Sequence, residues 1–323
     1  MIVTVTLNPA VDRIYWVDSL RMCEVVEEEY LTRATRSATC AGGKGVNMSI
    51  LLAQLGVESV AMGFIGGFAG RTVVGDLRDK GVTTHFVWTR GETRTNVTVL
   101  EKGRAYVPIF IDEAGSPVEE RDVERFMKRY QRMLERATWV VLAGSLPPNM
   151  DPGIYYDLAR RAREAGARVV LSAGGEALER ALEAGPAVVK PDTRADRRLL
   201  GGDLDSRDAV IAAGREMVSR GAGIVLISHD ITGDIAVTRD GVWEIQTSVK
   251  VSDLRNLIGA DDALLAGVLY QLDREATLED ALRFGLAAGI ATAESDLKLC
   301  GDPQQIRAEM ERITVKQIGG GVQ

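Results

Sequence analysis

Cysteine, histidine and aromatic residues are scarce in this chain of 323 residues. Its three cysteines are far apart and form no Cys-x-x-Cys pair, so they provide neither a disulfide framework nor a zinc cluster. His85 and His229 are too widely separated for the His-Glu-x-x-His motif of zinc proteases. Aromatic residues make up 5% of the chain, too few to indicate a platform on which nucleic-acid bases stack.

Excess positive charge and long apolar runs are also absent. Lys plus Arg number 39 against 46 Asp plus Glu, and the net charge of −7 disfavours binding to a nucleic-acid backbone. No apolar run approaches the length of a membrane span, and the first residues read as a strand without the basic segment of a signal peptide. We therefore expect a cytoplasmic protein without nucleic-acid or membrane partners. A local pocket for one small anion stays compatible with this charge.

Short apolar runs alternate along the chain with amphipathic stretches. The expected strands cover Ile2–Leu7, Val60–Phe64, Trp139–Ala143, Val169–Ser172, Ala187–Lys190 and Ile224–Ser228. Several of them are apolar on both faces, as buried parallel strands are. The expected helices cover Asn47–Leu55, Thr72–Asp79, Asp122–Glu135, Pro152–Glu164, Glu176–Glu183, Arg207–Ser219, Asp262–Leu272 and Leu278–Ser295. This alternation predicts one α/β domain over residues 1–323, with a doubly wound, mostly parallel sheet between two helical layers.

Two segments, about residues 12–39 and 85–111, interrupt this rhythm. They are rich in Val, Thr, Tyr and Trp and lack a helical period. We expect them to leave the α/β body and form a small β-sheet that acts as a lid. The glycine-rich tail Gly319–Gly321 is expected to be frayed.

Residues 41–47, Ala-Gly-Gly-Lys-Gly-Val-Asn, precede a strong helical pattern. Glycines let the backbone approach a ligand closely, and the free N–H groups of a helix start attract an anion. Lys44 adds a point charge suited to phosphate. The segment is not a Walker A loop, because GxxxxGK[ST] is missing. A glycine-rich turn with a solvated lysine is the alternative interpretation, and this segment alone leaves both open.

A second helix start reads Gly-Ala-Asp-Asp-Ala at residues 259–263. A carboxylate at a helix N-terminus is usually a cap. Here Gly259 and Ala260 could also shape an anion nest beside Asp262. That arrangement suits a hydroxyl attacking a phosphoryl group, because the carboxylate takes the hydroxyl proton while N–H groups hold the developing charge.

Seven motifs follow one another along the chain, at residues 6–12 (Thr-Leu-Asn-Pro-Ala-Val-Asp), 42–47 (Gly-Gly-Lys-Gly-Val-Asn), 63–67 (Gly-Phe-Ile-Gly-Gly), 93–97 (Thr-Arg-Thr-Asn-Val), 144–148 (Gly-Ser-Leu-Pro-Pro), 190–191 (Lys-Pro) and 256–262 (Asn-Leu-Ile-Gly-Ala-Asp-Asp). Taken together, they closely resemble the ribokinase-like (PfkB) carbohydrate kinases, in particular the 1-phosphofructokinase and tagatose-6-phosphate kinase branch. The resemblance covers nearly the whole chain.

The resemblance implies a ribokinase-like fold that transfers the γ-phosphoryl group of ATP to a hydroxyl of a ketohexose phosphate, with Mg²⁺ and with Asp262 as the base. It places the sugar phosphate at Asp12, Gly43, Lys44, Asn47, Arg94 and Ser145. It places the nucleotide at Lys190, Asp192, Ser228, Asp230, Gly233, Gly259, Ala260 and Asp261. It also implies a β-lid that closes over the sugar and joins two chains into a homodimer. Metal ligands stay unassigned.

The sequence departs from the family on the nucleotide side. Asp261, Asp192, Asp230 and Asp234 stand where the family has neutral residues, and Ala195 replaces a glutamate. Two unit charges about 4 Å apart at an effective dielectric of about 20 interact by roughly 4 kcal/mol, so these carboxylates are expected to repel a polyanionic donor. The alternative hypothesis is therefore a catalytically impaired relative that binds sugar phosphate as a sensor or partner subunit.

Overall fold

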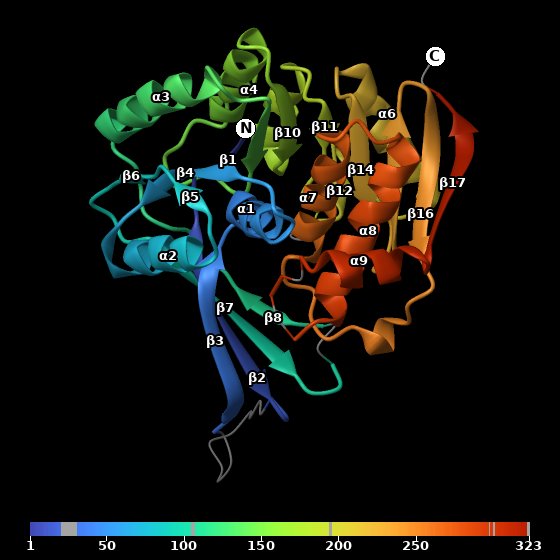
Figure 1. Ribbon diagram of the computed structural model, residues 1–323, viewed down its shortest axis with the longest axis horizontal. Coiled ribbons are helices and arrows are strands. Elements are labelled where there is room, and N and C mark those ends of the chain that lie inside the picture. Colours follow the sequence, from blue (N-terminus) through green and yellow to red (C-terminus); the bar gives the residue numbers. More distant parts are fainter. Residues whose placement is uncertain (21–30, 105–106, 194–195, 297, 300, 322–323) are drawn as a thin grey trace.

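Two sheets organise the chain in this computed structural model, which describes residues 1–20, 31–104, 107–193, 196–296, 298–299 and 301–321 (Figure 1). In these residues a large sheet has eleven strands and a small sheet has four. The large sheet has the order β17-β16-β15-β14-β11-β10-β9-β1-β4-β5, and β6 also pairs with β4. Its strands are β1 (Ile2–Thr6), β4 (Ser59–Ile65), β5 (Thr83–Thr84), β6 (Val87–Trp88), β9 (Trp139–Ala143), β10 (Arg168–Ser172), β11 (Val188–Val189), β14 (Ile224–Ser228), β15 (Gly233–Thr238), β16 (Gly241–Thr247) and β17 (Ile313–Gly320).

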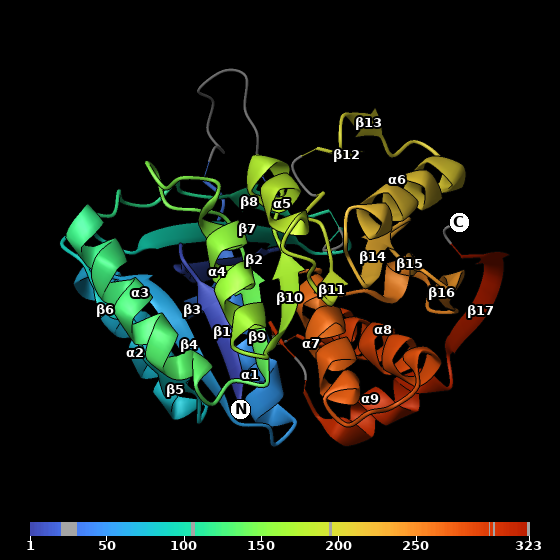
Figure 2. The ribbon, with the colours of Figure 1, turned by 90° about the horizontal axis from the view of Figure 1, so that it is seen from above.

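Helices cover both faces of the large sheet and make a three-layer fold, as expected (Figure 2). One face carries α1 (Lys44–Gln54), α2 (Gly67–Asp79), α7 (Ala260–Leu272), α8 (Leu278–Glu294) and α9 (Pro303–Met310). The other carries α3 (Glu120–Leu134), α4 (Ile154–Glu164), α5 (Gly175–Leu182) and α6 (Arg207–Ser219). A short 3₁₀ turn covers Val251–Asp253. No helix in the described part of the chain combines the length and apolarity needed to cross a bilayer.

The alternation of side chains along the strands explains the two apolar layers. Successive residues of a strand point to opposite faces of its sheet. In β9, Val140 and Leu142 belong to the apolar cluster that includes α3–α6, whereas Val141 belongs to the cluster that includes α1, α7 and α8. Strands such as β9 are apolar at consecutive positions because both faces of the sheet are covered.

The expected parallel strands are confirmed to within one residue at each end. The antiparallel extension β15-β16-β17 was not expected. The prediction of a frayed Gly319–Gly321 tail was wrong for Gly319 and Gly320, because both pair with β16 as the end of β17. Without β17, the backbone groups along this edge of β16 would have no strand partner. The glycine-rich composition of the tail did not reveal that such an edge was there to pair with it.

Five helices begin earlier than expected: α3, α5 and α7 by one or two residues, and α1 and α2 by more. α1 begins at Lys44 rather than Asn47, and α2 begins at Gly67 rather than Thr72. Gly43, with φ of 106°, is the residue before α1, so the glycine-rich loop is short and Gly45 already lies in the helix. A Cβ at Gly45 would lie 2.6 Å from Thr6 Oγ1, so the glycine lets the start of α1 pack directly on the end of β1.

The small sheet has the order β3-β2-β7-β8 and projects from the body of the large sheet (Figure 1). Its strands are β2 (Ala10–Val17), β3 (Ala34–Gly42), β7 (Arg94–Glu101) and β8 (Ile109–Ile111). Residues 21–30 and 105–106 of the two expected lid segments lie outside the described residues. Val87 and Trp88, within the second expected segment, pair with β4 of the large sheet instead. A separate two-stranded pairing joins β12 (Arg198–Leu199) to β13 (Gly202–Asp203).

Glycines allow α7 and α8 to pack at backbone distance. A Cβ added at Gly285 of α8 would lie 2.4 Å from Val268 Cγ2 and 2.9 Å from the carbonyl oxygen of Leu264, both in α7. The residue thus has no room for a side chain. Because Asp261 and Asp262 lie in the first turn of α7, this packing also determines where those carboxylates lie.

We expect Gly285→Ala to lower the free energy of unfolding by about 1–3 kcal/mol, because the added methyl group overpacks the helix contact. The matched control is Gly75→Ala in α2, where nothing lies within 4 Å of the added Cβ and a small stabilisation is expected. Urea denaturation followed by circular dichroism measures both. An equal loss in the two variants would contradict the close contact.

Candidate active site

A cavity of about 800 Å³ lies at the carboxyl ends of the parallel strands. β1 is flanked by β4 on one side and β9 on the other, so the strand order reverses at β1. Open α/β sheets bind ligands at such a switch point. The cavity is lined there by Asn8, Gly144, Asp192 and Ser228, which follow or end β1, β9, β11 and β14.

The predicted site residues gather in this cavity, with two exceptions. Those that line it are Asp12, Gly43, Lys44, Asn47, Arg94, Ser145, Asp192, Ser228, Asp230, Gly259, Ala260, Asp261 and Asp262. Lys190 and Gly233 are not among the lining residues. Lys190 is connected to the cavity through its ion pair with Asp261, and Gly233 begins β15, whose next residue, Asp234, lines the cavity.

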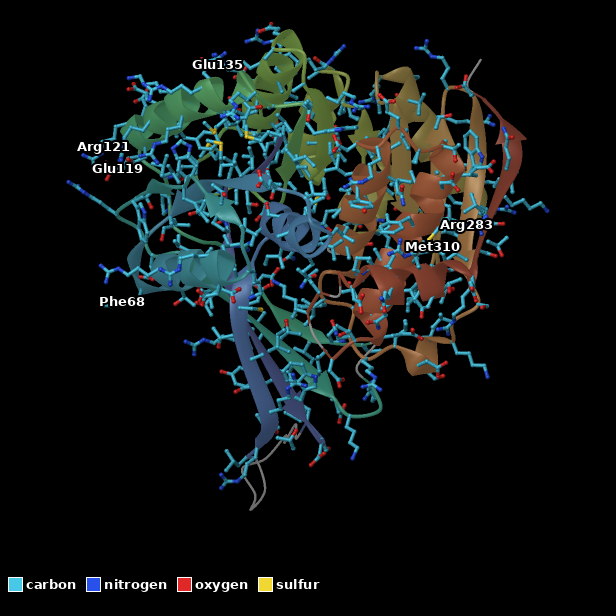
Figure 3. All side chains as sticks on the ribbon, viewed as in Figure 1. Phe68, Glu119, Arg121, Glu135, Arg283 and Met310 are labelled. Carbon is cyan, nitrogen blue, oxygen red and sulfur yellow. The ribbon has the colours of Figure 1, made fainter. Side chains whose placement is uncertain are left out.

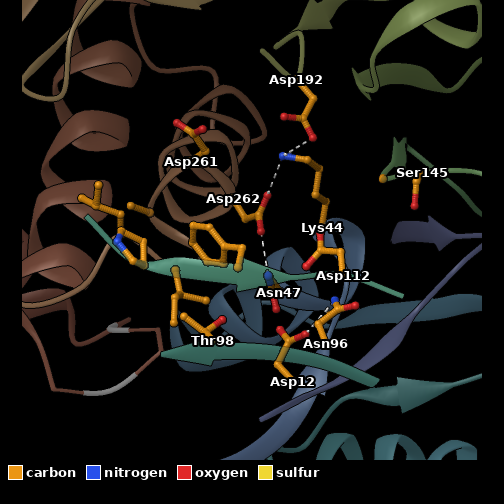
Figure 4. Close-up of a pocket in the computed structure, with 18 of the residues that line it drawn as sticks. Asp12, Lys44, Asn47, Asn96, Thr98, Asp112, Ser145, Asp192, Asp261 and Asp262 are labelled. Atoms are coloured by element: carbon orange, nitrogen blue, oxygen red, sulfur yellow. Dashed lines mark hydrogen bonds and ion pairs between the residues drawn. The ribbon is translucent and has the colours of Figure 1, made fainter. Parts of the chain in front are cut away.

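At the centre of the cavity the N-termini of two helices meet (Figure 4). Asn47 of α1 donates a hydrogen bond from Nδ2 to Asp262 Oδ2 of α7 at 2.6 Å. Lys44 Nζ lies 3.7 Å from Asp262 Oδ1 and 3.4 Å from Asp192 Oδ2. Lys44, Asn47 and Asp262 are all buried. Helix N-termini attract negative charge, so this centre suits a group that carries several anionic oxygens.

One end of the cavity is formed by the small sheet, and we call it the small-sheet end. It is lined by Asp12 of β2 and by Arg94, Asn96 and Thr98 of β7. Asn96 Nδ2 donates to Asp12 Oδ1 at 3.1 Å, and Figure 4 shows this pair below Asn47. Arg94 donates from Nε to the Asn8 carbonyl at 3.1 Å and from Nη1 to the Glu113 carbonyl at 3.0 Å. Two backbone carbonyls thus hold the guanidinium at the cavity wall.

Two buried amide oxygens lack hydrogen-bond partners at this end. Oδ1 of Asn47 and Oδ1 of Asn96 have none within the described part of the chain. Both residues line the cavity. A buried acceptor without a donor is costly, so these oxygens favour a ligand that brings hydroxyl donors.

The opposite end, which we call the large-sheet end, holds the carboxylates singled out in the sequence. Lys190 Nζ donates to Asp234 Oδ1 and Ser228 Oγ, each at 2.8 Å, and lies 3.2 Å from Asp261 Oδ1. Burial alone lowers the pKa of Lys190, but the charges of Asp234 and Asp261 outweigh burial and raise it. Lys190 is therefore an ammonium ion at neutral pH.

These ion pairs offset part of the repulsion expected from the sequence, for three of its four added carboxylates. Asp234 and Asp261 share Lys190, and Asp192 lies beside Lys44. The expectation counted the added carboxylates and left out the lysines that face them. Arg194 and Ala195 lie outside the described residues, so the replacement of the family glutamate stays a statement about the sequence.

Burial distinguishes these ion pairs from those on the surface. Lys190 and Asp234 have side chains 4% and 6% exposed, whereas Arg121 and Glu119, whose ion pair lies at the outer edge of the molecule, are 55% and 47% exposed (Figure 3). Exposed pairs contribute little to stability. A buried pair is costly to break, because the remaining charge is left without compensation.

Several lining residues were not predicted as site residues. Asn8, Asn96 and Gly144 belong to motifs already noted, so their position beside predicted residues was the available signal. Phe110 and Ile231 line the cavity and are about half exposed, which only the structure reveals.

Comparison with known proteins identifies relatives over nearly the whole chain. The model of the pfkB family carbohydrate kinases matches residues 6–298. A 1-phosphofructokinase of Bacillus subtilis is 33% identical over 296 residues, which cover 92% of this chain and 93% of the relative.

Solved structures include similar folds. A Thermotoga maritima protein described as a possible 1-phosphofructokinase has a TM-score of 0.89 and 34% identity, with 98% of this chain and 99% of that chain covered. Phosphofructokinase-2 from Escherichia coli in complex with substrates and products has a TM-score of 0.83 and 27% identity, with 96% and 98% covered. These matches confirm the resemblance and the fold that were inferred from the sequence motifs.

We expect Lys190→Met to lower the free energy of unfolding by about 3–5 kcal/mol, because Asp234 loses its buried cation. The double variant Lys190→Met/Asp234→Asn, which removes both charges, is expected to lose clearly less. Chemical denaturation at pH 7 measures the two. A double variant that is less stable than Lys190→Met would contradict the charge pairing.

Proposed function

The chain belongs to the pfkB family of carbohydrate kinases, and from this premise we propose that it transfers the γ-phosphoryl group of ATP to a hydroxyl of a ketohexose phosphate such as fructose 1-phosphate. The names of the relatives that are similar over nearly the whole chain support this substrate class. The observation that carries the proposal is the position of Asp262, a buried carboxylate between the two ends of the cavity (Figure 4).

Asp262 acts as the general base in this proposal. Its Oδ2 accepts the hydrogen bond from Asn47, which orients the carboxylate, and Lys44 Nζ lies 3.7 Å from its Oδ1. A carboxylate in this position takes the proton of the attacking hydroxyl as the oxygen bonds to phosphorus. The backbone N–H groups around Gly259–Asp261, at the start of α7, then stabilise the charge on the transferred phosphoryl group.

The small-sheet end binds the sugar phosphate. Asp12 and the unpartnered oxygens of Asn47 and Asn96 accept hydrogen bonds from sugar hydroxyls. Arg94, with Lys44 and the backbone at Gly43, binds the phosphate group already present on the sugar. Ser145 lies near the phosphoryl group in transfer.

The large-sheet end binds the nucleotide. Ser228, Asp230 and Gly233 lie at the β14–β15 turn, and Ile231 in the same turn offers an apolar surface for the purine ring. Asp192 and Asp230 offer the hard carboxylate oxygens that Mg²⁺ takes, together with oxygens of the phosphates. When bound, Mg²⁺ neutralises charge on the phosphates.

We further propose that residues 1–323 act as one domain whose small sheet closes over the sugar and pairs two chains. The three residues of β8 are all exposed and apolar: Ile109, Phe110 and Ile111. Phe110 also lines the cavity, so closing the small sheet would cover the substrate. A second copy packing on β8 would remove its apolar side chains from water.

The first test is ADP release with Mg-ATP and fructose 1-phosphate, fructose 6-phosphate or tagatose 6-phosphate. We expect turnover with fructose 1-phosphate and a loss of about 10²- to 10⁴-fold in kcat for Asp262→Asn, because the amide cannot accept the proton. The matched control is Asp253→Asn, an exposed carboxylate in the 3₁₀ turn.

The impaired-relative alternative has a different outcome in the same assay. Thermal stabilisation by a sugar phosphate, little stabilisation by Mg-ATP and no ADP release would support a sensor or partner subunit. Asp230, which lines the large-sheet end and is not one of the carboxylates paired above with Lys190 or Lys44, is the departure that favours this alternative.

Lys44→Ala and Arg94→Ala test the binding of the sugar's own phosphate group at the small-sheet end. Each is expected to weaken sugar-phosphate binding by about tenfold or more, since a charge-assisted hydrogen bond is lost. Isothermal titration calorimetry with fructose 1-phosphate measures the dissociation constant. Unchanged affinity in both variants would remove the assignment of this end.

A further inference from the structure

Lys298 is a buried lysine that lies just outside the cavity and has no part in the function proposed above. It follows α8 in the chain and belongs to none of the motifs found in the sequence. Its side chain is 8% exposed, and it is not among the lining residues. A lysine is rarely buried without a specific partner, so its contacts need an explanation.

The partner of Lys298 is the carboxylate at the small-sheet end. Lys298 Nζ donates to Asp12 Oδ2 at 2.5 Å and to the carbonyl oxygen of Ala41 at 2.7 Å. Ala41 directly precedes the Gly42-Gly43 pair that leads into α1. One ammonium group therefore connects the start of β2 to the end of β3.

The carboxylate of Asp12 is held from three sides. Oδ1 accepts the hydrogen bond from Asn96, and Oδ2 accepts the one from Lys298. Gly42 closes the third side, because a Cβ there would lie 2.4 Å from Asp12 Cγ. A carboxylate has about four lone-pair positions, and these two donors leave one on each oxygen. Each oxygen of Asp12 can thus accept one further hydrogen bond, in a direction set by the donors already bound.

Lys298 also lies against Gly259, the residue directly before α7. Gly259 has φ of 78°, and a Cβ there would lie 3.1 Å from the carbonyl oxygen of Lys298 and 2.9 Å from Leu299 Cδ2. The backbone of Lys298 therefore packs on the helix start that carries Asp262. One residue thus contacts both the start of α7, through its backbone, and Asp12 in β2, through its side chain.

The charges at this end also depend on Lys298. Burial alone lowers the pKa of Lys298, but Asp12, followed by smaller contributions that include Asp262, raises it above its usual value. The ammonium form is thus favoured, and it compensates the negative charge of Asp12. Without it, Asp12 would be an uncompensated anion at the end of the cavity that takes a phosphorylated sugar.

We propose that Lys298 is a positioning residue that determines acceptor affinity through Asp12, by holding that carboxylate in the orientation in which it accepts the sugar hydroxyls. This inference rests on the proposed function, since it concerns the same sugar-binding end. Lys298 itself does not touch the sugar. Its removal is therefore expected to act on binding of the acceptor and to leave the chemistry at Asp262 in place.

The test is the Michaelis constant for fructose 1-phosphate at saturating Mg-ATP. Lys298→Met keeps the apolar stem and removes the charge. We expect it to raise KM by about tenfold, because Asp12 is no longer held in place and one charge-assisted hydrogen bond to the sugar is lost. We expect kcat to change less than about threefold. Lys316→Met, an exposed lysine of β17, is the matched control and should leave both constants unchanged.

A double-mutant cycle with Asp12→Asn separates positioning from a purely structural role. If Lys298 acts through Asp12, Lys298→Met raises KM less than about twofold in the Asp12→Asn background. Thermal unfolding of all four proteins confirms that the measured chains are folded. A tenfold rise in both backgrounds, or a change confined to the melting temperature, overturns the inference.

The two proposals fail in different ways. If the wild-type chain releases no ADP with any ketose phosphate, the proposed function fails and this inference fails with it. If the wild type is active and Lys298→Met has the wild-type KM, only the role of Lys298 is overturned.

Discussion

The contact between the N-termini of α1 and α7 is the constraint on which the site depends. Asn47 and Lys44 approach Asp262 from α1. The glycines at the contact between α7 and α8 let these helices pack closely and so determine how far α7 reaches towards the cavity. Each helix start brings N–H groups without a partner inside the helix to the same place, so the centre attracts anions before any side-chain charge is counted. The carboxylate of Asp262 is accommodated there because two donors of α1 face it. The base and the phosphate-binding groups are therefore products of one packing arrangement.

Ionic compensation follows the same arrangement on both sides of this centre. At the large-sheet end Lys190 faces Asp234 and Asp261, and at the small-sheet end Lys298 faces Asp12. The net charge of −7 says nothing about this local balance. Each buried lysine has a raised pKa, because the charges of its carboxylate partners outweigh the burial that lowers it. A site that must admit phosphates can thus keep several carboxylates.

Local pattern was sufficient for most of the fold and for part of the site. Several parallel strands were apolar at consecutive positions, and the glycine-flanked helix starts marked Lys44 and Asp262. The pattern failed at β17, whose glycine-rich end is ordered by the edge of β16, and at the start of α1, where Gly45 packs on β1. In both places a distant strand supplied the interaction, and a local window of sequence contains no trace of its partner.

The sequence by itself determined the layered α/β architecture, the family and the chemical types gathered at the strand ends, because periodicity and motif order are properties of the linear chain. Only the tertiary structure decided which charge faces which. Asp12 and Lys298 are separated by 286 residues, and Lys190 meets Asp234 across 44. Coulomb interactions and hydrogen bonds act over a few ångströms in space, so residue types reveal the charges while folding alone determines their partners.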